Sequence, residues 1–190
     1  MFGQTPSQTV GPYFTIGMVN GDENILVQRE TVGERINIEG YLLDGAGQPV
    51  TDGCIEIWQA DANGIYNHPA DPRRAEADPA FVGFGRSPTN DEGLFSFKSI
   101  RPGPVTYDDT QDQAPHILVR VFMRGTLLHA VTRLYFSDRE TANQSDPVLN
   151  GMPEGKRERL IACRDDREGT PTFRFDIHMQ GEQAMVFFEP

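Results

Sequence analysis

The sequence has few of the groups from which many enzymes build a site within one chain. Its 190 residues include two cysteines and four histidines, and no two histidines stand two, three or four positions apart. The motifs HExxH, CxxC, GxSxG, GxGxxG and the P-loop do not occur in it. A self-contained metal site, a nucleophile elbow and a nucleotide-binding loop therefore lack their signatures.

The chain also lacks excess positive charge and long apolar runs. Its formal net charge is −11 and no Lys/Arg stripe offsets it locally, so nucleic acid and anionic membranes are not expected partners. No apolar run approaches the roughly 18 residues that cross a bilayer. The start, MFGQTPSQTVGP, has neither the basic nor the apolar region of a signal peptide. We expect a cytoplasmic protein.

Length and cysteine usage bound the architecture. A chain of 190 residues, of which 37% are hydrophobic, can bury one sizeable core, so we expect a single domain over residues 1–190. Cys54 and Cys163 lie far apart in apolar, strand-like segments. We expect them to be small buried thiols rather than the two halves of a disulfide.

What the sequence does contain is a β pattern. Turn-forming clusters of Gly, Pro, Asn and Asp separate segments that alternate or are rich in β-branched and aromatic residues. The expected strands are 34–43, 54–60, 94–100, 116–123, 130–136, 172–179 and 184–188. Several short strands with turn signals favour an all-β, antiparallel β-sandwich.

Two segments are left open by this pattern. Residues 155–166, GKRERLIACRDD, are compatible with a short helix or with a hairpin to the following strand. Residues 61–93 contain an excursion longer than ordinary connections. It is as compatible with a solvated loop as with a functional one.

Several conspicuous side chains have a simple structural interpretation. The adjacent carboxylates Asp108 with Asp109 and Asp165 with Asp166 lie in polar, turn-like stretches, which favours solvated positions over acid–base catalysis. Trp58 lies in an alternating strand segment, and we expect it to pack in the core. The glycine-bounded GFGRSP, residues 83–88, is also better explained by packing.

Two further segments have residues suited to binding. In QAPHILVRVFMRG, residues 113–125, a strand pattern carries His116 and ends at Arg124. Taken alone, Arg124 before a glycine is more typical of a solvated charge at a hairpin end. In TVGPY, residues 9–13, a glycine permits close approach, a proline fixes the backbone and a tyrosine provides an aromatic wall. A frayed terminus is the simpler alternative there.

A run of motifs resembles the intradiol ring-cleavage dioxygenases. It comprises TPSQTVGPYF, IEIWQADANGIY, GFGRSPTNDEGLFSF, IRPGPV, APHI and RLYFSD, in order from Thr5 across nearly the whole chain. In that family a β-sandwich holds ferric iron between two tyrosines and two histidines. The enzyme inserts both atoms of O2 between the hydroxyl-bearing carbons of a catechol, a step in aromatic catabolism. Phenolate and imidazole suit ferric iron, and a catecholate can chelate it.

The chain departs from the family's iron pattern at the ligand positions. Val105 and Leu118 stand where the family has a tyrosine and a histidine, and Arg73 or Arg74 stands in place of the other tyrosine. Only His116 matches. We therefore expect His116 to be a hydrogen-bonded strand histidine, not a ligand. The resemblance implies a chain without its own metal site, the family's α-chain type, with Fe(III) bound by a related β chain in a hetero-oligomer.

The resemblance also gives the binding segments a role. It implies that Arg124 faces the carboxylate of protocatechuate (3,4-dihydroxybenzoate) at a shared site. In an acidic protein a planar guanidinium would attract and orient that anion. Thr9, Gly11, Pro12 and Tyr13, in an N-terminal arm over about residues 1–20, would lie beside the ring.

Two alternatives remain at this point. One is a non-catalytic β-sandwich that binds a protein or ligand and is derived from a dioxygenase. The other is a self-sufficient dioxygenase with a rearranged metal site.

Overall fold

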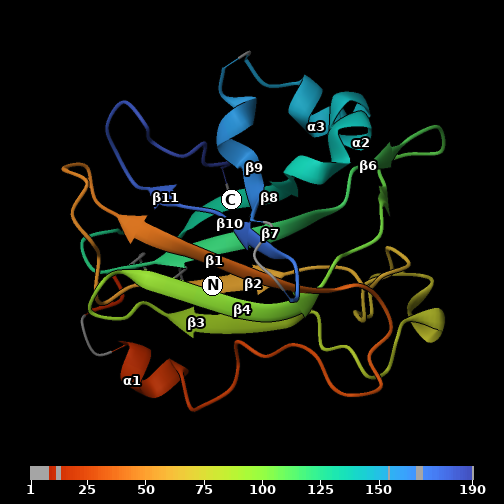
Figure 1. The fold of residues 1–190 in the computed structure, drawn as a ribbon, viewed down its shortest axis with the longest axis horizontal. Coiled ribbons are helices and arrows are strands. Elements are labelled where there is room, and N and C mark those ends of the chain that lie inside the picture. Colours follow the sequence, from red (N-terminus) through yellow and green to blue (C-terminus); the bar gives the residue numbers. More distant parts are fainter. Residues whose placement is uncertain (1–8, 12–13, 154, 166–168, 190) are drawn as a thin grey trace, which may run out of the picture.

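A curled nine-stranded β-sheet forms the centre of the protein (Figure 1). The computed structural model describes residues 9–11, 14–153, 155–165 and 169–189. The strands are β1 (Arg35–Leu43), β2 (Cys54–Trp58), β3 (Phe84–Pro88), β4 (Leu94–Ile100), β5 (Val105–Thr106), β6 (Asp112–Gln113), β7 (His116–Phe122), β8 (Ala130–Phe136), β9 (Ile161–Asp165), β10 (Thr172–Arg174) and β11 (Ile177–His178). The helices are α1 (Phe14–Met18), α2 (Glu140–Ser145) and α3 (Pro147–Asn150), with 3-10 turns η1 (Arg74–Glu76), η2 (Ser137–Arg139) and η3 (Arg157–Leu160). No helix in the described ranges is long and apolar enough to cross a membrane.

The strands form two halves that share one core. In one half β4, β1, β10 and β9 are neighbours, and in the other β3, β2, β7 and β8 are neighbours. Strand β9 joins the halves because it pairs with β10 on one side and with β8 on the other. Buried side chains of both halves meet between them, as expected for a β-sandwich. The fold class inferred from the sequence is confirmed.

Alternation explains how the long strand β1 is buried. Ile36, Ile38 and Leu42 are buried whereas the residues between them are partly exposed. Gly40 continues the buried face, and a Cβ there would collide with the carbonyl of Phe175 and the ring of Phe95. That position needs a glycine because the backbone of the next segment lies directly on the strand.

The strand predictions were correct for the central segments and wrong at the C-terminal end. Residues 184–188 form no strand and hold only an isolated bridge between Val131 and Phe188. They are fixed by single hydrogen bonds, such as Thr132 Oγ1 to the Val186 carbonyl at 2.7 Å. Two pairs with β1 and the β8–β9 pair are parallel, although most ladders are antiparallel.

Four strands, β3, β5, β6 and β9, lie outside the predicted strand segments, and the structure answers the question that residues 155–166 left open. Strand β3 coincides with GFGRSP, where Gly85 allows Leu26 and the Glu23 carbonyl to approach closely, so the packing interpretation is confirmed. Residues 155–166 supply both alternatives, since η3 precedes β9 and β9 pairs antiparallel with β10.

The two cysteines differ in exposure. Both are free thiols; Cys54 is buried, whereas Cys163 is exposed. The expectation of a buried Cys163 was wrong because its side chain points away from the core, between the buried Ala162 and the exposed Arg164 of β9. Burial raises the pKa of the Cys54 thiol to about 11, so that group stays protonated and inert.

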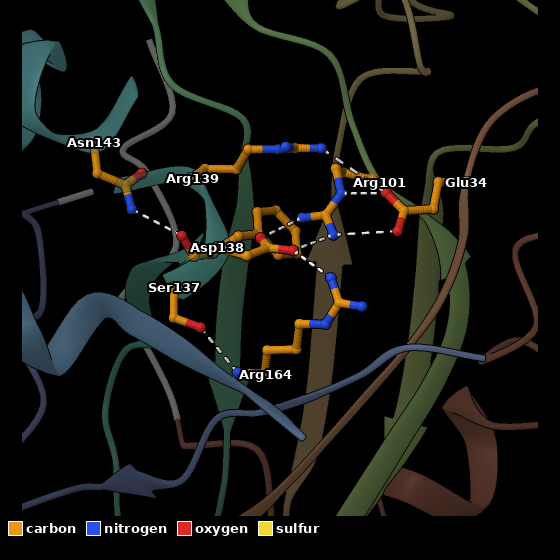
Figure 2. A network of polar contacts seen from close by, with 8 residues as sticks. Glu34, Arg101, Ser137, Asp138, Arg139, Asn143 and Arg164 are labelled. Carbon is orange, nitrogen blue, oxygen red and sulfur yellow. Dashed lines mark hydrogen bonds and ion pairs between the residues drawn. The ribbon is translucent and has the colours of Figure 1, made fainter. Parts of the chain in front are cut away.

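A buried arginine ties the ends of several strands together (Figure 2). Arg101, which is only 6% exposed, lies at the end of β4 against the rings of Phe136 and Phe173, whose centroids are 5.0 and 4.9 Å from its guanidinium carbon. Its guanidinium donates to Glu34 at 2.6 Å and to both oxygens of Asp138 at 2.9 and 2.8 Å. The charge is thus paired with two carboxylates and packed against two aromatic rings, which makes Arg101 a structural clamp.

Candidate functional site

One face of β7 carries the positions that the sequence singled out. Ile117 and Val119 point into the core, and the alternate residues His116, Leu118 and Arg120 point to the opposite face. Along that face exposure rises from the buried His116 to the exposed Arg120. The face therefore begins inside the protein and ends at the surface.

His116 is a buried, hydrogen-bonded strand histidine, as predicted. Its Nδ1 lies 2.8 Å from the carbonyl of Ala114, so this nitrogen carries the proton and donates it. Burial, reinforced by the positive charge of Arg133, lowers the pKa of the ring to about 4. The ring also lies against Tyr135, with centroids 5.6 Å apart. The residue is neutral at pH 7 and one of its two nitrogens is already used.

A buried carboxylate next to His116 organises the same corner of the fold. Asp146 is fully buried and accepts hydrogen bonds from the backbone N–H groups of Ala114, Val148 and Leu149 at 2.8 to 2.9 Å. The hydroxyl of Tyr135 lies 3.3 Å from it, and burial raises the pKa of that phenol. Sequence reasoning missed this group, although Asp146 before a proline at a helix start is a recognisable N-cap signal.

Beyond His116 the face opens into two adjoining pockets of about 330 and 540 Å³ that share Trp58 and His68. Trp58 stacks on Tyr66 with centroids 5.7 Å apart, and the ring of His68 meets Trp58 edge-on. The core assignment of Trp58 was wrong. Trp58 and Glu56 are two positions apart, so both lie on the outer face of β2, while Ile57 between them faces the core.

The positions expected to lack metal ligands line these pockets. Leu118 borders the smaller pocket, and Val105 and Arg73 border the larger one. Arg73 donates to the Gly64 carbonyl at 2.8 Å and pairs with Asp71 at 3.4 Å. The structure therefore places Arg73 at this site. Arg74 is exposed and turned toward another loop residue, Asn67, at 3.3 Å.

This donor set does not fit ferric iron. Valine and leucine have no lone pair, arginine is a cation, and His116 is the one imidazole at the four positions. Within the described ranges no group of three or more His, Cys, Asp or Glu side chains could hold a metal ion.

The long excursion after β2 forms one wall of the larger pocket. The buried Asp61 fixes its start, because its carboxylate accepts from the backbone N–H groups of Asn63 and Ile65 and, across the loop, of Asp78 at 2.9 to 3.0 Å. Such anchoring makes the segment an ordered wall rather than a freely solvated loop. Its His68 and Arg73 line the pocket.

The paired carboxylates remain turn residues where they are described. Asp108 and Asp109 are exposed, and Asp108 caps its own turn by accepting from Thr110 N at 2.8 Å. Asp165 lies at the end of β9, and Asp166 lies outside the described residues.

A second region, at the turn between β7 and β8, brings together two of the predicted binding residues. The backbone N–H of Gly125 donates to Thr9 Oγ1 at 3.2 Å, so the N-terminal segment lies beside Arg124. Gly11 is partly buried, and a Cβ added there would meet no atom of the described residues within 4 Å. Pro12 and Tyr13 lie outside the described residues.

Arg124 itself is held by one contact and is otherwise open. Its side chain is 66% exposed, and its Nε lies 2.8 Å from Oδ2 of Asp52. The two groups form an ion pair without the alignment of a hydrogen bond, since Oδ2 is buried and has no hydrogen-bond donor among the described residues. Sequence reasoning missed Asp52 because the contact depends on strand register.

Apolar side chains stand exposed on the same turn. Leu127 and Leu128 are 64% and 54% exposed. Ile16 of α1, which follows Thr9 closely in the chain, is 73% exposed. Neighbouring exposed leucines on one turn are typical of a surface that a partner covers.

Comparison with known proteins shows the family. A family model described as "Dioxygenase" matches residues 9–181. The protocatechuate 3,4-dioxygenase alpha chain of Pseudomonas putida is 40% identical over 98% of this chain and 96% of its own length. The corresponding alpha chain of Burkholderia cepacia is 39% identical over 98% and 97%. The protocatechuate 3,4-dioxygenase beta chain of B. cepacia is 34% identical over 85% of this chain and 71% of its own.

Solved structures share the fold at low sequence identity. The dioxygenase domain of a dioxygenase carbohydrate-binding protein fusion from Streptomyces sp. SirexAA-E aligns with a TM-score of 0.60 and 23% identity. It covers 94% of this chain and 99% of its own. An intradiol ring-cleavage dioxygenase from Tetranychus urticae aligns with a TM-score of 0.59 and 20% identity, over 97% and 99%. The sandwich, the order of the motifs and the whole-length relatives agree: the chain belongs to the intradiol dioxygenase family.

Proposed function

We propose that this chain is the α subunit of a protocatechuate 3,4-dioxygenase. Together with an iron-bearing β subunit it catalyses the O2-dependent intradiol cleavage of protocatechuate to 3-carboxy-cis,cis-muconate. The observation that carries the proposal is the near-complete match to two alpha chains, combined with a pocket that has lost its ligands at Val105 and Leu118. The proposal treats residues 1–190 as one domain.

In this proposal Fe(III) is bound by the partner and not by this chain. The described pockets support that assignment because Leu118, Val105 and Arg73, which line them at three of the four ligand positions, have no lone pair to offer a ferric ion. The single imidazole at those positions, on His116, is buried and donates to a carbonyl. The iron supplies the oxygen chemistry in the β subunit.

This chain contributes the group that binds the substrate carboxylate. Arg124 is exposed, and none of its N–H groups has a hydrogen-bond acceptor within the described part of the chain, so they are available to an anion. A planar guanidinium can bind a carboxylate through two N–H groups. In a chain with a formal charge of −11, such a local cation attracts an anionic substrate that the mean field repels.

The N-terminal segment completes the wall of the shared site. Thr9 is anchored beside Arg124 through Gly125, which brings the segment to the substrate end of the site. Gly11 leaves space for a flat ring, and Pro12 and Tyr13 continue the segment in the sequence. We assign all four residues to substrate binding alongside Arg124.

The β7–β8 turn also supports a partner on this side of the molecule. Burying Leu127 and Leu128 against a β chain removes apolar surface from water next to Arg124. The substrate site would then form where the two chains meet.

Reconstitution tests the subunit assignment. The chain is co-expressed with an intradiol β chain that contains the PGPY and HxH motifs, and the complex is purified by a tag on one chain only. We expect a stable heteromer that cleaves protocatechuate, with neither chain fully active alone. Full turnover by the β chain without this one, or failure to co-purify, would overturn the proposal.

A substitution at Arg124 tests the substrate role. In the heteromer, Arg124→Ala is expected to lower kcat/KM for protocatechuate by about 100-fold, the loss of a charge-assisted carboxylate partner. Catechol has no carboxylate and should be affected much less, whether it is followed as a substrate or as a competitive inhibitor. Arg29→Ala is the matched control, since Arg29 is an exposed arginine with no side-chain contact among the described residues. An equal loss for both compounds would mean that Arg124 serves folding or assembly.

A further inference from the structure

The turn before β2 holds a carboxylate directly opposite Arg124. Cys54 of β2 pairs with Phe122 of β7 in an antiparallel ladder. Two residues beyond this pair, in opposite directions along the two strands, stand Asp52 and Arg124. In an antiparallel ladder such positions lie across from each other, which explains the 2.8 Å contact between Asp52 Oδ2 and Arg124 Nε.

Asp52 lies in a turn that the fold holds firmly. The backbone N–H of the next residue, Gly53, donates to Thr89 Oγ1 at 2.8 Å, and Thr89 N donates back to the Gly53 carbonyl at 3.0 Å. A Cβ at Gly53 would collide with Leu42, so the turn packs directly on the core. Asp52 is therefore a fixed charge, whereas Arg124 is a long side chain that is 66% exposed.

Among the described residues, Arg124 is the one cation that pairs with Asp52. The side chain of Asp52 is 21% exposed, and Oδ2 is buried without a hydrogen bond among the described residues. An inward-turned, poorly solvated carboxylate attracts a nearby cation more strongly than a surface one does. The contact is an ion pair that occupies no aligned N–H of the guanidinium, so Arg124 is restrained in position while its donors stay available.

The geometry points to Asp52 as a positioning residue for the recognition of the substrate carboxylate. It acts through Arg124, which it holds at the mouth of the site in the orientation that binds the anion. This inference rests on the proposed function of Arg124. If Arg124 is already held in one position, less side-chain entropy is lost when the substrate binds, and the affinity is higher.

The test combines substitutions at both positions in the assembled heteromer. Asp52→Asn keeps the size of the side chain and removes its charge. We expect KM for protocatechuate to rise about three- to tenfold, the range for ordering one rotamer-rich side chain, with kcat little changed. The constants for catechol should stay the same. Asp52→Glu should restore part of the effect, and Asp91→Asn, an exposed turn carboxylate, is the charge-matched control.

The double variant separates the possible outcomes. If Asp52 acts through Arg124, adding Asp52→Asn to Arg124→Ala should change KM for protocatechuate no further. An unchanged or lowered KM in Asp52→Asn, with Arg124→Ala still selective for protocatechuate, would overturn the role of Asp52 and leave the proposed function standing. A loss in Arg124→Ala that is equal for protocatechuate and catechol would overturn the proposed function itself. Heteromer formation and melting temperature are checked for every variant.

Discussion

Strand β7 runs from a pocket at its start to the β7–β8 turn at its end. The two regions differ in burial, in charge and in the kind of side chain that they present. The pocket end has a buried histidine with a pKa of about 4, apolar residues at two former ligand positions and an arginine bound to its own loop. The turn end has an exposed arginine, a fixed carboxylate and uncovered leucines. Within one chain, the groups that would bind a metal are gone, while a group suited to binding a substrate is present.

This difference indicates how two related chains can divide one reaction. A metal site needs several donors within a small volume, so the loss of two or three abolishes it. A carboxylate site needs one well-placed guanidinium, so it can be supplied from a neighbouring chain. The buried start of β7 at His116 is consistent with a structural role, whereas the exposed turn at its end is suited to contact with a substrate and a partner.

The largest expected effect is on the stability of the whole fold and comes from a residue outside both regions, Arg101. Arg101→Ala should lower the free energy of unfolding by about 3–5 kcal/mol, because it removes the buried hydrogen-bonded partner of both Glu34 and Asp138 and the packing of the guanidinium against two rings. Urea denaturation measures the change. The exposed Arg29→Ala should stay within about 0.5 kcal/mol. A similar small change in Arg101→Ala would show that the clamp contributes little.

A second prediction concerns the buried His116 at the start of β7. The pKa of His116 is lowered by burial to about 4, so the unfolded chain binds more protons between that pH and about 6.5. The stability from neutral His116 is therefore complete above pH 6.5 and is lost as the pH falls toward 4. Relative to His116→Phe, the native chain should lose up to about 3 kcal/mol more between pH 7 and pH 4.

Denaturation curves at several pH values measure this difference. The neighbouring Asp146 and Arg133 are present in both proteins, so the difference between the two profiles reports the substitution of His116. Parallel stability profiles for the native chain and the variant would contradict a neutral, buried His116.

The smallest expected effect concerns the open turn. Leu127 and Leu128 are each more than half exposed. A partner that covers them would therefore bury roughly half of each side chain. Replacing both by serine should cost about 2 kcal/mol of association, or about 30-fold in the dissociation constant of the heteromer. The control is Val32→Ser, an apolar side chain that is 62% exposed elsewhere. Equal weakening by both changes would remove the turn from the interface.

The sequence predicts features that depend on local pattern and misses those that depend on register or on distant contacts. Alternation is enough to identify β1 and its buried Ile36 and Ile38. It did not identify the segment 184–188 as irregular, because an apolar run can pack on a core without a strand to pair with. Arg101 pairs with Glu34, which lies 67 positions away in the sequence, and the local pattern around neither residue predicts this contact.

The candidate site shows the same division. The sequence alone shows that Val105 and Leu118 cannot be metal ligands, once the family's motifs are aligned with it. The expectation that Trp58 packs in the core was wrong because it put Trp58 and Glu56 on opposite faces of β2. Residues two positions apart in a strand lie on the same face. The pairing of Asp52 with Arg124 required the register between β2 and β7, which no single segment specifies.

The iron content of the separate chains tests the central claim most directly. This chain, purified alone after expression with added iron, should be colourless and contain no stoichiometric metal by elemental analysis. The heteromer should contain iron in proportion to its β chain and show the visible tyrosinate-to-iron absorption. Stoichiometric iron with that absorption in this chain alone would contradict the account and favour a rearranged metal site within it.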